Sequence, residues 1–183
     1  MARPDSGTED AMKTFRGLAV LLLAGSMTMP AGCGDSDSVA LGDDGRLPVA
    51  GTSTFVREVT DSTQTEVGDV LEARDLVWIY EDEMSDERAE GTEEVTINYD
   101  LYPTGLADMW GTAVITNDGG TWEGEWVGSI HGDGTHTVYQ DLTGTGDYAG
   151  LRYHRFVVFE TPTGKFSGTM AGISGWIEPA ERP

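Results

Sequence analysis

The chain of 183 residues is poor in lysine, in cysteine and in long apolar runs. Lys13 and Lys165 are its only lysines, and 11 basic residues face 32 acidic ones, which gives a formal charge of −21. Nucleic-acid binding is disfavoured, because affinity for phosphates comes from clustered Lys and Arg. An acidic surface of this kind instead keeps a protein soluble.

The single cysteine, Cys33, excludes an internal disulfide, so the fold depends on its core alone. The apolar run from Leu18 to Ala24 is too short to span a bilayer as a mature helix. The apolar fraction of 38% nevertheless predicts a folded domain rather than a wholly disordered chain.

The N-terminal segment has the pattern of an export signal. Lys13 and Arg16 precede the apolar run, as the positive n-region of a signal peptide does, so we expect residues 1–32 to be removed. Residues 1–11 carry three acids ahead of that signal, which is the wrong charge for an n-region. We therefore expect translation to start at Met12.

Cys33 follows Ala31 and Gly32 and resembles the cysteine of a bacterial lipobox, although Pro30 stands where Leu is usual. The resemblance implies a lipid on Cys33 that anchors the exported protein to the cell envelope, on the outer face of the membrane. An ordinary secretory signal that leaves a free thiol is the alternative. Residues 33–51 are rich in Gly, Asp and Ser and are expected to be a flexible tether.

Residues 52–178 show no helical stripe but eight short runs of β-branched and aromatic residues, followed by a tail at 179–183. The runs are 53–60, 69–80, 92–102, 109–116, 121–130, 135–143, 151–160 and 165–177. The segments NDGG (117–120), HGDG (131–134) and TPTG (161–164) are typical of tight hairpin turns. Short turns make neighbouring strands antiparallel, so the sequence predicts an all-β antiparallel meander.

Alternation assigns the two faces of each strand. Val95, Ile97 and Tyr99 share one face of the third run, and Leu151, Tyr153, Val157 and Phe159 share one face of the seventh. In the last run Phe166, Met170 and Trp176 share a face with Gly168 and Gly172. Inward glycines and an even strand count favour an eight-stranded antiparallel β-barrel, which leaves no edge strands.

The stretch TWEGEWVGSI (121–130) offers two interpretations of Glu123 and Glu125. Alternation places them opposite Trp122 and Trp126, and solvated carboxylates beside buried tryptophans avoid the cost of burying two charges. The other interpretation is a catalytic acid/base pair, in which crowding raises one pKa.

The segments SDERAEGTEEVTINYDLYP (85–103), GTWEGEWVG (120–128) and LTGTGDYAGLRYHRF (142–156) resemble bacterial members of the allene oxide cyclase barrel superfamily, whose fold relatives include dirigent proteins and spirotetronate cyclases. The resemblance implies an eight-stranded barrel with an apolar cavity, but fold alone does not assign function. We expect a module that binds an apolar small molecule through Tyr99, Trp122, Trp126, Tyr153, Phe166 and Met170. The alternatives are a cofactor-free cyclase or isomerase using Tyr153 or Arg155, and a filled barrel whose outer surface binds a partner.

No cofactor or metal is expected. His131, His136 and His154 do not form a zinc motif, and the acidic turns lack the calcium-loop pattern. Arg88, in the loop 85–91, is expected to pair locally with Asp86 or Glu90. Alternatively, that loop covers the barrel mouth and Arg88 faces in.

Overall fold

The structure is a computed structural model that describes residues 45–60, 63–160 and 170–180, apart from the side chains of Glu160 and Met170. Cys33, the export segment, Phe166 and the TPTG turn lie outside these residues. The elements are β1 (Leu47–Thr60), β2 (Thr63–Val67), β3 (Val70–Met84), β4 (Gly91–Leu101), β5 (Ala107–Asn117), β6 (Gly120–Ile130), β7 (Thr135–Gly144), the 3₁₀ turn η1 (Gly146–Tyr148), β8 (Leu151–Glu160) and β9 (Met170–Pro179). No helix in the described ranges has the length and apolar character needed to cross a bilayer.

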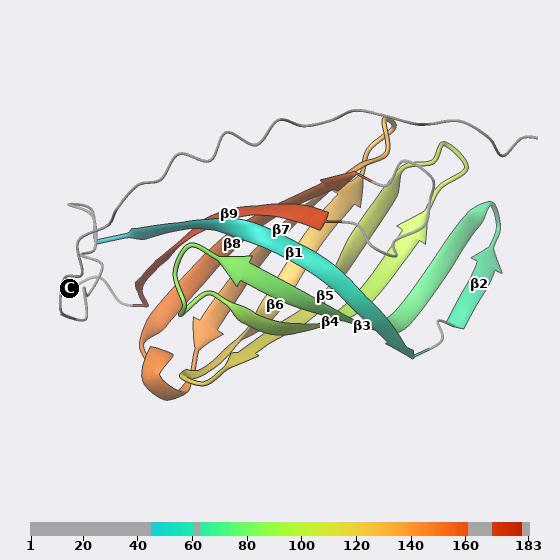
Figure 1. Ribbon diagram of the computed structural model, residues 1–183. Helices are drawn as coiled ribbons and strands as arrows, with labels where there is room; N and C mark the ends of the chain where they lie inside the picture. The colour runs from blue at the N-terminus through green and yellow to red at the C-terminus, as the bar shows by residue number, and fades with distance from the viewer. Residues whose placement is uncertain (1–44, 61–62, 161–169, 181–183) are drawn as a thin grey trace, which may run out of the picture. The chain divides into compact units, whose positions relative to one another are not determined.

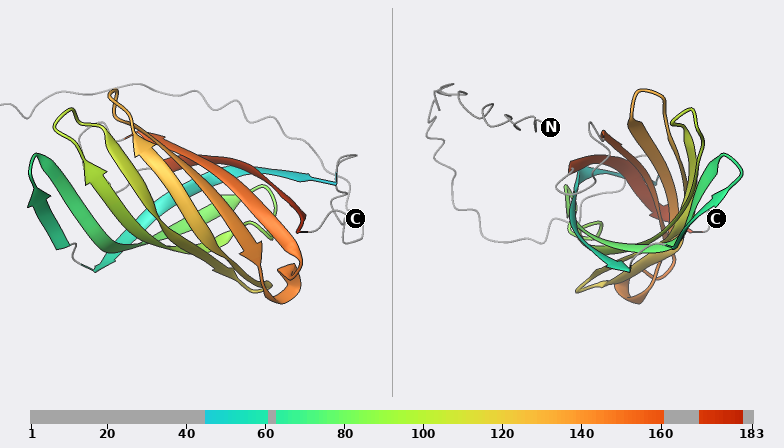
Figure 2. Two further views of the ribbon diagram at one scale, coloured as in Figure 1. Left: turned by 180° about the vertical axis from the view of Figure 1, so that it is seen from behind. Right: turned by 90° about the vertical axis from the view of Figure 1, so that its right-hand side faces the viewer.

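Eight of these strands close into an antiparallel barrel, as predicted (Figure 1 and Figure 2). Each strand from β3 to β9 pairs with the next, β9 pairs with β1, and β1 pairs with the second half of β3. The additional strand, β2, pairs with the first half of β3. Between these halves, at Asp75, the backbone has a positive φ of 57° and the register with β4 shifts. This bulge lets one strand serve both the barrel and the β2–β3 hairpin.

The barrel begins earlier than the composition suggested. Leu47 and Val49 are 2% and 3% exposed and pack in the core, although they belong to the segment expected to be a tether. Their alternation with Pro48 and Ala50 places both on the inner face, where Leu47 pairs with Ile177 of β9. The folded barrel therefore starts at Leu47.

Alternation predicts the inner faces of most strands correctly. Val95 and Ile97 of β4 are buried, as are Trp122 and Trp126 of β6 and Tyr153 and Val157 of β8. The prediction for the last strand is wrong, because Ala171, Ile173 and Ile177 are buried while Trp176 lies on the outer surface. There the Trp176 ring stacks on His154, with a centroid separation of 4.9 Å. The prediction follows the large side chain of Trp176, although Ser174 and Glu178 share its face and the isoleucines occupy the other.

One end of the barrel is closed by an aromatic plug under the loop 85–91. Trp122 stacks on Tyr148 with ring centroids 4.9 Å apart, and its edge contact with Tyr153 is at 5.5 Å. Its indole Nε1 donates a hydrogen bond to the carbonyl oxygen of Arg88 at 2.6 Å, and Ala89 of the loop is fully buried. This loop therefore covers the closed end.

Arg88 itself takes the local pairing that the sequence suggested. Its guanidinium donates to both carboxylate oxygens of Asp86, with Nε 2.8 Å from Oδ1 and Nη2 2.9 Å from Oδ2. The loop does cover one end of the barrel, as the alternative expected, but the inward position of Arg88 is wrong, because its side chain pairs with Asp86 and does not line the cavity described below.

Inward glycines allow neighbouring strands to approach closely at the tryptophan strand. A Cβ atom at Gly124 would collide with the carbonyl oxygen of Asp141 on β7. Gly172 is predicted to face inward but is exposed on the outer face of β9, where the nearest atom to an added Cβ would be the Val158 carbonyl oxygen at 3.9 Å, an ordinary contact. There is thus no room for a side chain at position 124, whereas there is room for one at position 172.

We predict that Gly124→Ala lowers the free energy of unfolding by about 1–3 kcal/mol, because the added methyl group forces β6 away from β7. Gly172→Ala should change it by less than about 0.5 kcal/mol. Urea denaturation followed by tryptophan fluorescence measures both. Equal midpoints for the two variants would contradict this account of the strand spacing.

Candidate ligand cavity

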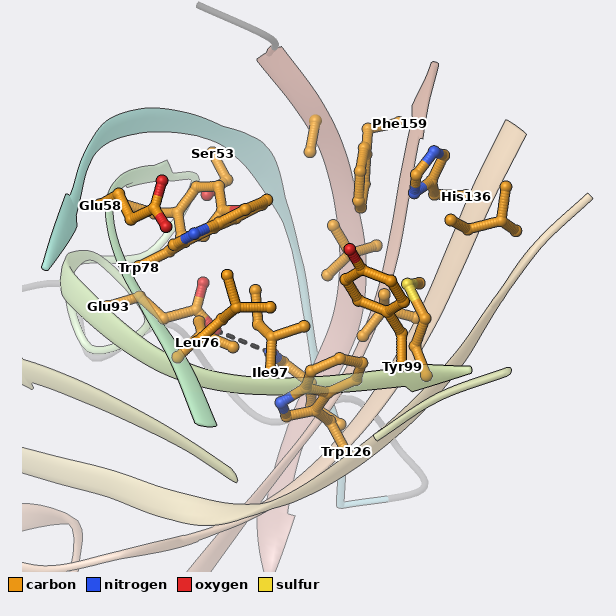
Figure 3. Close-up of a pocket in the computed structure, with 18 of the residues that line it drawn as sticks. Ser53, Glu58, Leu76, Trp78, Glu93, Ile97, Tyr99, Trp126, His136 and Phe159 are labelled. Atoms are coloured by element: carbon orange, nitrogen blue, oxygen red, sulfur yellow. Dashed lines mark hydrogen bonds between the residues drawn. The ribbon is translucent and has the colours of Figure 1, made fainter. Parts of the chain in front are cut away.

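A cavity of about 560 Å³ occupies the barrel interior beyond the aromatic plug (Figure 3). Its lining is mainly apolar, and the apolar residues come from the seven strands β3 to β9. The apolar lining residues are Leu76, Trp78, Val95, Ile97, Leu101, Met109, Trp126, Ile130, Val138, Val157, Phe159 and Ala171. Glu58 and Gln64, which are exposed, also line it, so the cavity reaches the surface beside β2. The volume is in the range of small-molecule sites.

The floor of the cavity is polar. Glu93 and Gln140 face each other across the interior, and the Gln140 Nε2 donates a hydrogen bond of 2.7 Å to Glu93 Oε1 (dashed in Figure 3). Ser53 and Tyr80 complete the floor, from β1 and β3. Strand register places these polar residues at one level of the barrel, since Tyr80 pairs with Glu93 and Gln140 pairs with Arg155.

Beneath the floor lies a fully buried cation. The Arg155 side chain is 0% exposed, and its Nη2 donates a hydrogen bond of 2.8 Å to Asp82 Oδ2. Its Nη1 lies 3.0 Å from Glu93 Oε1, and its guanidinium carbon is 5.7 Å from the Tyr153 ring centroid. A charge in the interior requires partners of this kind, because desolvation costs several kcal/mol per ion. We call Asp82, Glu93 and Arg155 the buried charge cluster.

Burial sets the ionisation of the groups around this cluster. Burial raises the pKa of Asp82 from 3.8 to about 7, with the Arg155 charge opposing the rise and the Glu93 charge adding to it. Burial, together with the charges of Glu93 and Asp82, also raises the pKa of Tyr80, so its phenol stays protonated. Burial lowers the pKa of Arg155, but the two carboxylates outweigh that effect and the net shift is upward. The guanidinium therefore remains charged.

One histidine belongs to the cavity wall. His136 is 3% exposed, lines the cavity and packs against Phe159 with ring centroids 4.5 Å apart. Burial lowers its pKa to about 4, with the charge of His131 adding to the effect, so the imidazole is neutral at pH 7. No group of three or more His, Cys, Asp or Glu in the described part of the chain is arranged to hold a metal ion.

The residues singled out from the sequence divide into four groups. Tyr99 and Trp126 line the cavity. Trp122 and Tyr153 are buried in the plug, and Arg155 lies below the floor, so these three do not line it. Phe166 and the Met170 side chain lie outside the described residues.

Glu123 and Glu125 form the fourth group and lie on the outer face of β6. They are exposed and point away from the cavity, and Glu123 Oε1 accepts a hydrogen bond of 2.7 Å from Thr121 Oγ1. The hypothesis that they are a catalytic acid/base pair for a ligand in the barrel is therefore wrong. The physical reason is the one that alternation indicated, since tryptophans occupy the inner face of this strand.

Sequence reasoning missed the polar floor, although a signal was present. Glu93 shares its strand face with Val95 and Ile97, Gln140 shares one with Val138 and Leu142, and Arg155 shares one with Tyr153. A charged residue on an otherwise apolar inner face indicates a buried partner of opposite charge.

Comparison with protein-family models, with curated proteins and with solved structures finds no match for this chain. The likeness to allene oxide cyclase barrels thus stays a prediction from the sequence segments.

We predict that Arg155→Met lowers the free energy of unfolding by about 3–5 kcal/mol, because it leaves two buried carboxylates without their cation. The matched control is Arg152→Met on the same strand. Arg152 is 45% exposed and its nearest carboxylate oxygen, on Asp141, is 3.8 Å away. That control should change stability by less than about 0.5 kcal/mol. Equal effects in urea denaturation would show that the cluster does not stabilise the barrel.

A second prediction concerns pH. Because the folded-state pKa of Asp82 is raised, the folded protein holds a proton that the unfolded chain releases, so this contribution to stability is full below pH 3.8 and is lost as pH rises to about 7. Relative to the parent, Asp82→Asn should therefore remove a decline in stability across that window. The measurement is the unfolding free energy of both proteins at each pH.

Asp86→Asn is the control of opposite sign. Hydrogen bonds from Arg88 lower the pKa of Asp86, so its contribution is present above pH 3.8 and is lost as pH falls through the lowered folded-state pKa. A difference curve for Asp82→Asn with no slope between pH 4 and 7 would contradict the protonation assigned to the cluster.

Proposed function

We propose that the protein is an exported lipoprotein whose barrel binds an apolar small molecule. The observation that carries the proposal is the cavity of about 560 Å³, with largely apolar walls and a few polar groups gathered at its floor. This combination is typical of small-molecule sites, in which apolar walls provide affinity and polar groups orient the ligand.

The N-terminal sequence supports the proposed location. The export signal and the lipobox-like Cys33 point to an anchor on the outer face of the membrane. The 13 residues 34–46 that separate Cys33 from β1 reach at most about 45 Å when extended. Such a tether would keep the barrel close to the membrane, which is a source of apolar molecules.

A cofactor-free cyclase or isomerase is the alternative enzyme function. It requires a reactive group in contact with the ligand, and neither candidate from the sequence lines the cavity. Export also separates the protein from intermediates that are made in the cytoplasm. Binding without reaction is therefore the better-supported proposal.

The second alternative, an interaction module, has an observation of its own. Four exposed apolar side chains, Trp110, Val127, Tyr139 and Phe156, stand in register across β5 to β8 on the outer face. This alternative also requires a barrel interior filled by side chains, however, and the cavity argues against a filled interior.

We predict that the full chain takes up N-phenyl-1-naphthylamine, an uncharged apolar dye whose fluorescence rises in apolar surroundings. Val95→Phe should reduce its affinity at least about tenfold, because Val95 lines the cavity and the larger ring occupies ligand space. Val127→Phe makes the same change on the outer face, where Val127 is 61% exposed, and should leave affinity unchanged. A fluorescence titration of the parent and the two variants measures these affinities. Equal dye affinity in Val95→Phe and Val127→Phe would place the binding site outside the barrel.

A further inference from the structure

One buried acceptor at the cavity floor, the side-chain oxygen of Gln140, has no hydrogen-bond donor among the described residues. The Gln140 amide has a fixed orientation, because its Nε2 must face the Glu93 carboxylate, which only accepts. Its Oε1 is consequently turned away from Glu93 and has no hydrogen-bond partner among the described residues. Gln140 is 3% exposed and lines the cavity, so this acceptor is buried at the place where a ligand would end.

The net charge of the floor also favours a hydrogen-bond donor over an anion. Asp82 and Glu93 supply two carboxylates to the single guanidinium of Arg155, so the cluster has one excess negative charge when both acids are ionised. Glu93 is the member that faces the cavity. A ligand carboxylate placed there would be a third acid in one buried site, which is strongly unfavourable.

From this floor we infer that the ligand is an apolar chain or ring system with a hydrogen-bond-donating head, a hydroxyl or an ammonium group, that lies against Gln140 Oε1 and Glu93, and that anionic lipids such as fatty acids are rejected. This inference rests on the proposed function, because it names the class of ligand for that same cavity. The apolar body contacts the walls formed by Leu76, Ile97 and Trp126. The head satisfies a buried acceptor that otherwise loses its hydration without compensation.

Four probes with the same number of heavy atoms in the chain test the head group on the full chain at pH 8, by displacement of the bound dye. Decanol donates one hydrogen bond, and its isomer nonyl methyl ether accepts but cannot donate. Decylamine adds a positive charge to the donor, while decanoate has a negative charge. We expect decanol and decylamine to bind about tenfold more tightly than the ether, and decanoate to bind about tenfold more weakly than the ether.

Three variants then test which residues cause the head-group preference. Gln140→Leu keeps the side-chain volume but removes one of the two acceptors, so the advantage of decanol over the ether should become smaller, with Glu93 as the remaining acceptor. Glu93→Gln removes the charge that faces the cavity and should reduce the advantage of decylamine. Glu123→Gln/Glu125→Gln removes two charges on the outer face and should change neither ratio, which controls for attraction of ammonium groups to the acidic surface. The four probes on the parent protein decide the question even where a variant does not fold.

The outcomes separate the two proposals. Equal affinity for all four probes, or tighter binding of decanoate, would overturn the head-group inference and leave a cavity that binds apolar molecules. Failure of both the dye and every probe to bind would overturn the proposed function and the head-group inference together.

Discussion

The ion pairs of Arg155 inside the barrel are the constraint on which the rest of the structure depends. A guanidinium with 0% exposure is tolerable only beside its carboxylates, Asp82 on β3 and Glu93 on β4, whereas Arg155 itself lies on β8. Asp82 is 73 residues away in sequence. In an open sheet β3 and β8 lie far apart, so the charges meet only when β1 joins β9 to β3. Closure of the barrel and neutralisation of its interior are therefore one event, and a shifted register would leave all three charges buried and unpaired.

This charged layer divides the interior into two parts with different properties. On one side the side chains are fully packed, and Trp122, Tyr148 and Tyr153 form an aromatic plug under the loop that contains Arg88. On the other side the side chains leave about 560 Å³ empty. The plug and the cluster supply buried contacts between strands at that end, so the fold does not depend on side chains filling the interior at the other end. An apolar cavity in a barrel without any disulfide is possible for this reason.

The sequence predicts the architecture well because the barrel is built from local signals. Alternation and turn residues act within one hairpin, and they correctly place the inner faces of β4, β6 and β8. The misses have specific physical causes. On β9 the large side chain of Trp176 suggests an inner face, but Ser174 and Glu178 share that face, and Ile173 and Ile177 occupy the core. At the start of β1, Leu47 and Val49 lie among small residues and resemble a linker.

The site is predicted less well, because its defining contacts join distant strands. The apolar neighbours of Glu93 on its strand face indicate that it is buried, but nothing local shows that Gln140 and Arg155 are its partners across the barrel.

The acidic surface and the buried charge cluster place their carboxylates in different environments, and this contrast bears on how the proposed site would distinguish ligands. On the surface, charges are hydrated and screened, so an excess of acids adds solubility and little specificity. When Asp82 and Glu93 are both ionised, which for Asp82 requires a pH above about 7, a single excess charge acts at the cavity floor. In this medium of low dielectric constant its interaction with a neighbouring group is several times stronger. The unpartnered Gln140 oxygen adds direction to that charge, because a hydrogen bond requires a donor in one place. Apolar walls alone discriminate weakly between molecules of similar size. In the proposed ligand-binding function, selectivity would therefore reside in Glu93 and Gln140, which the contacts around Arg155 hold in position.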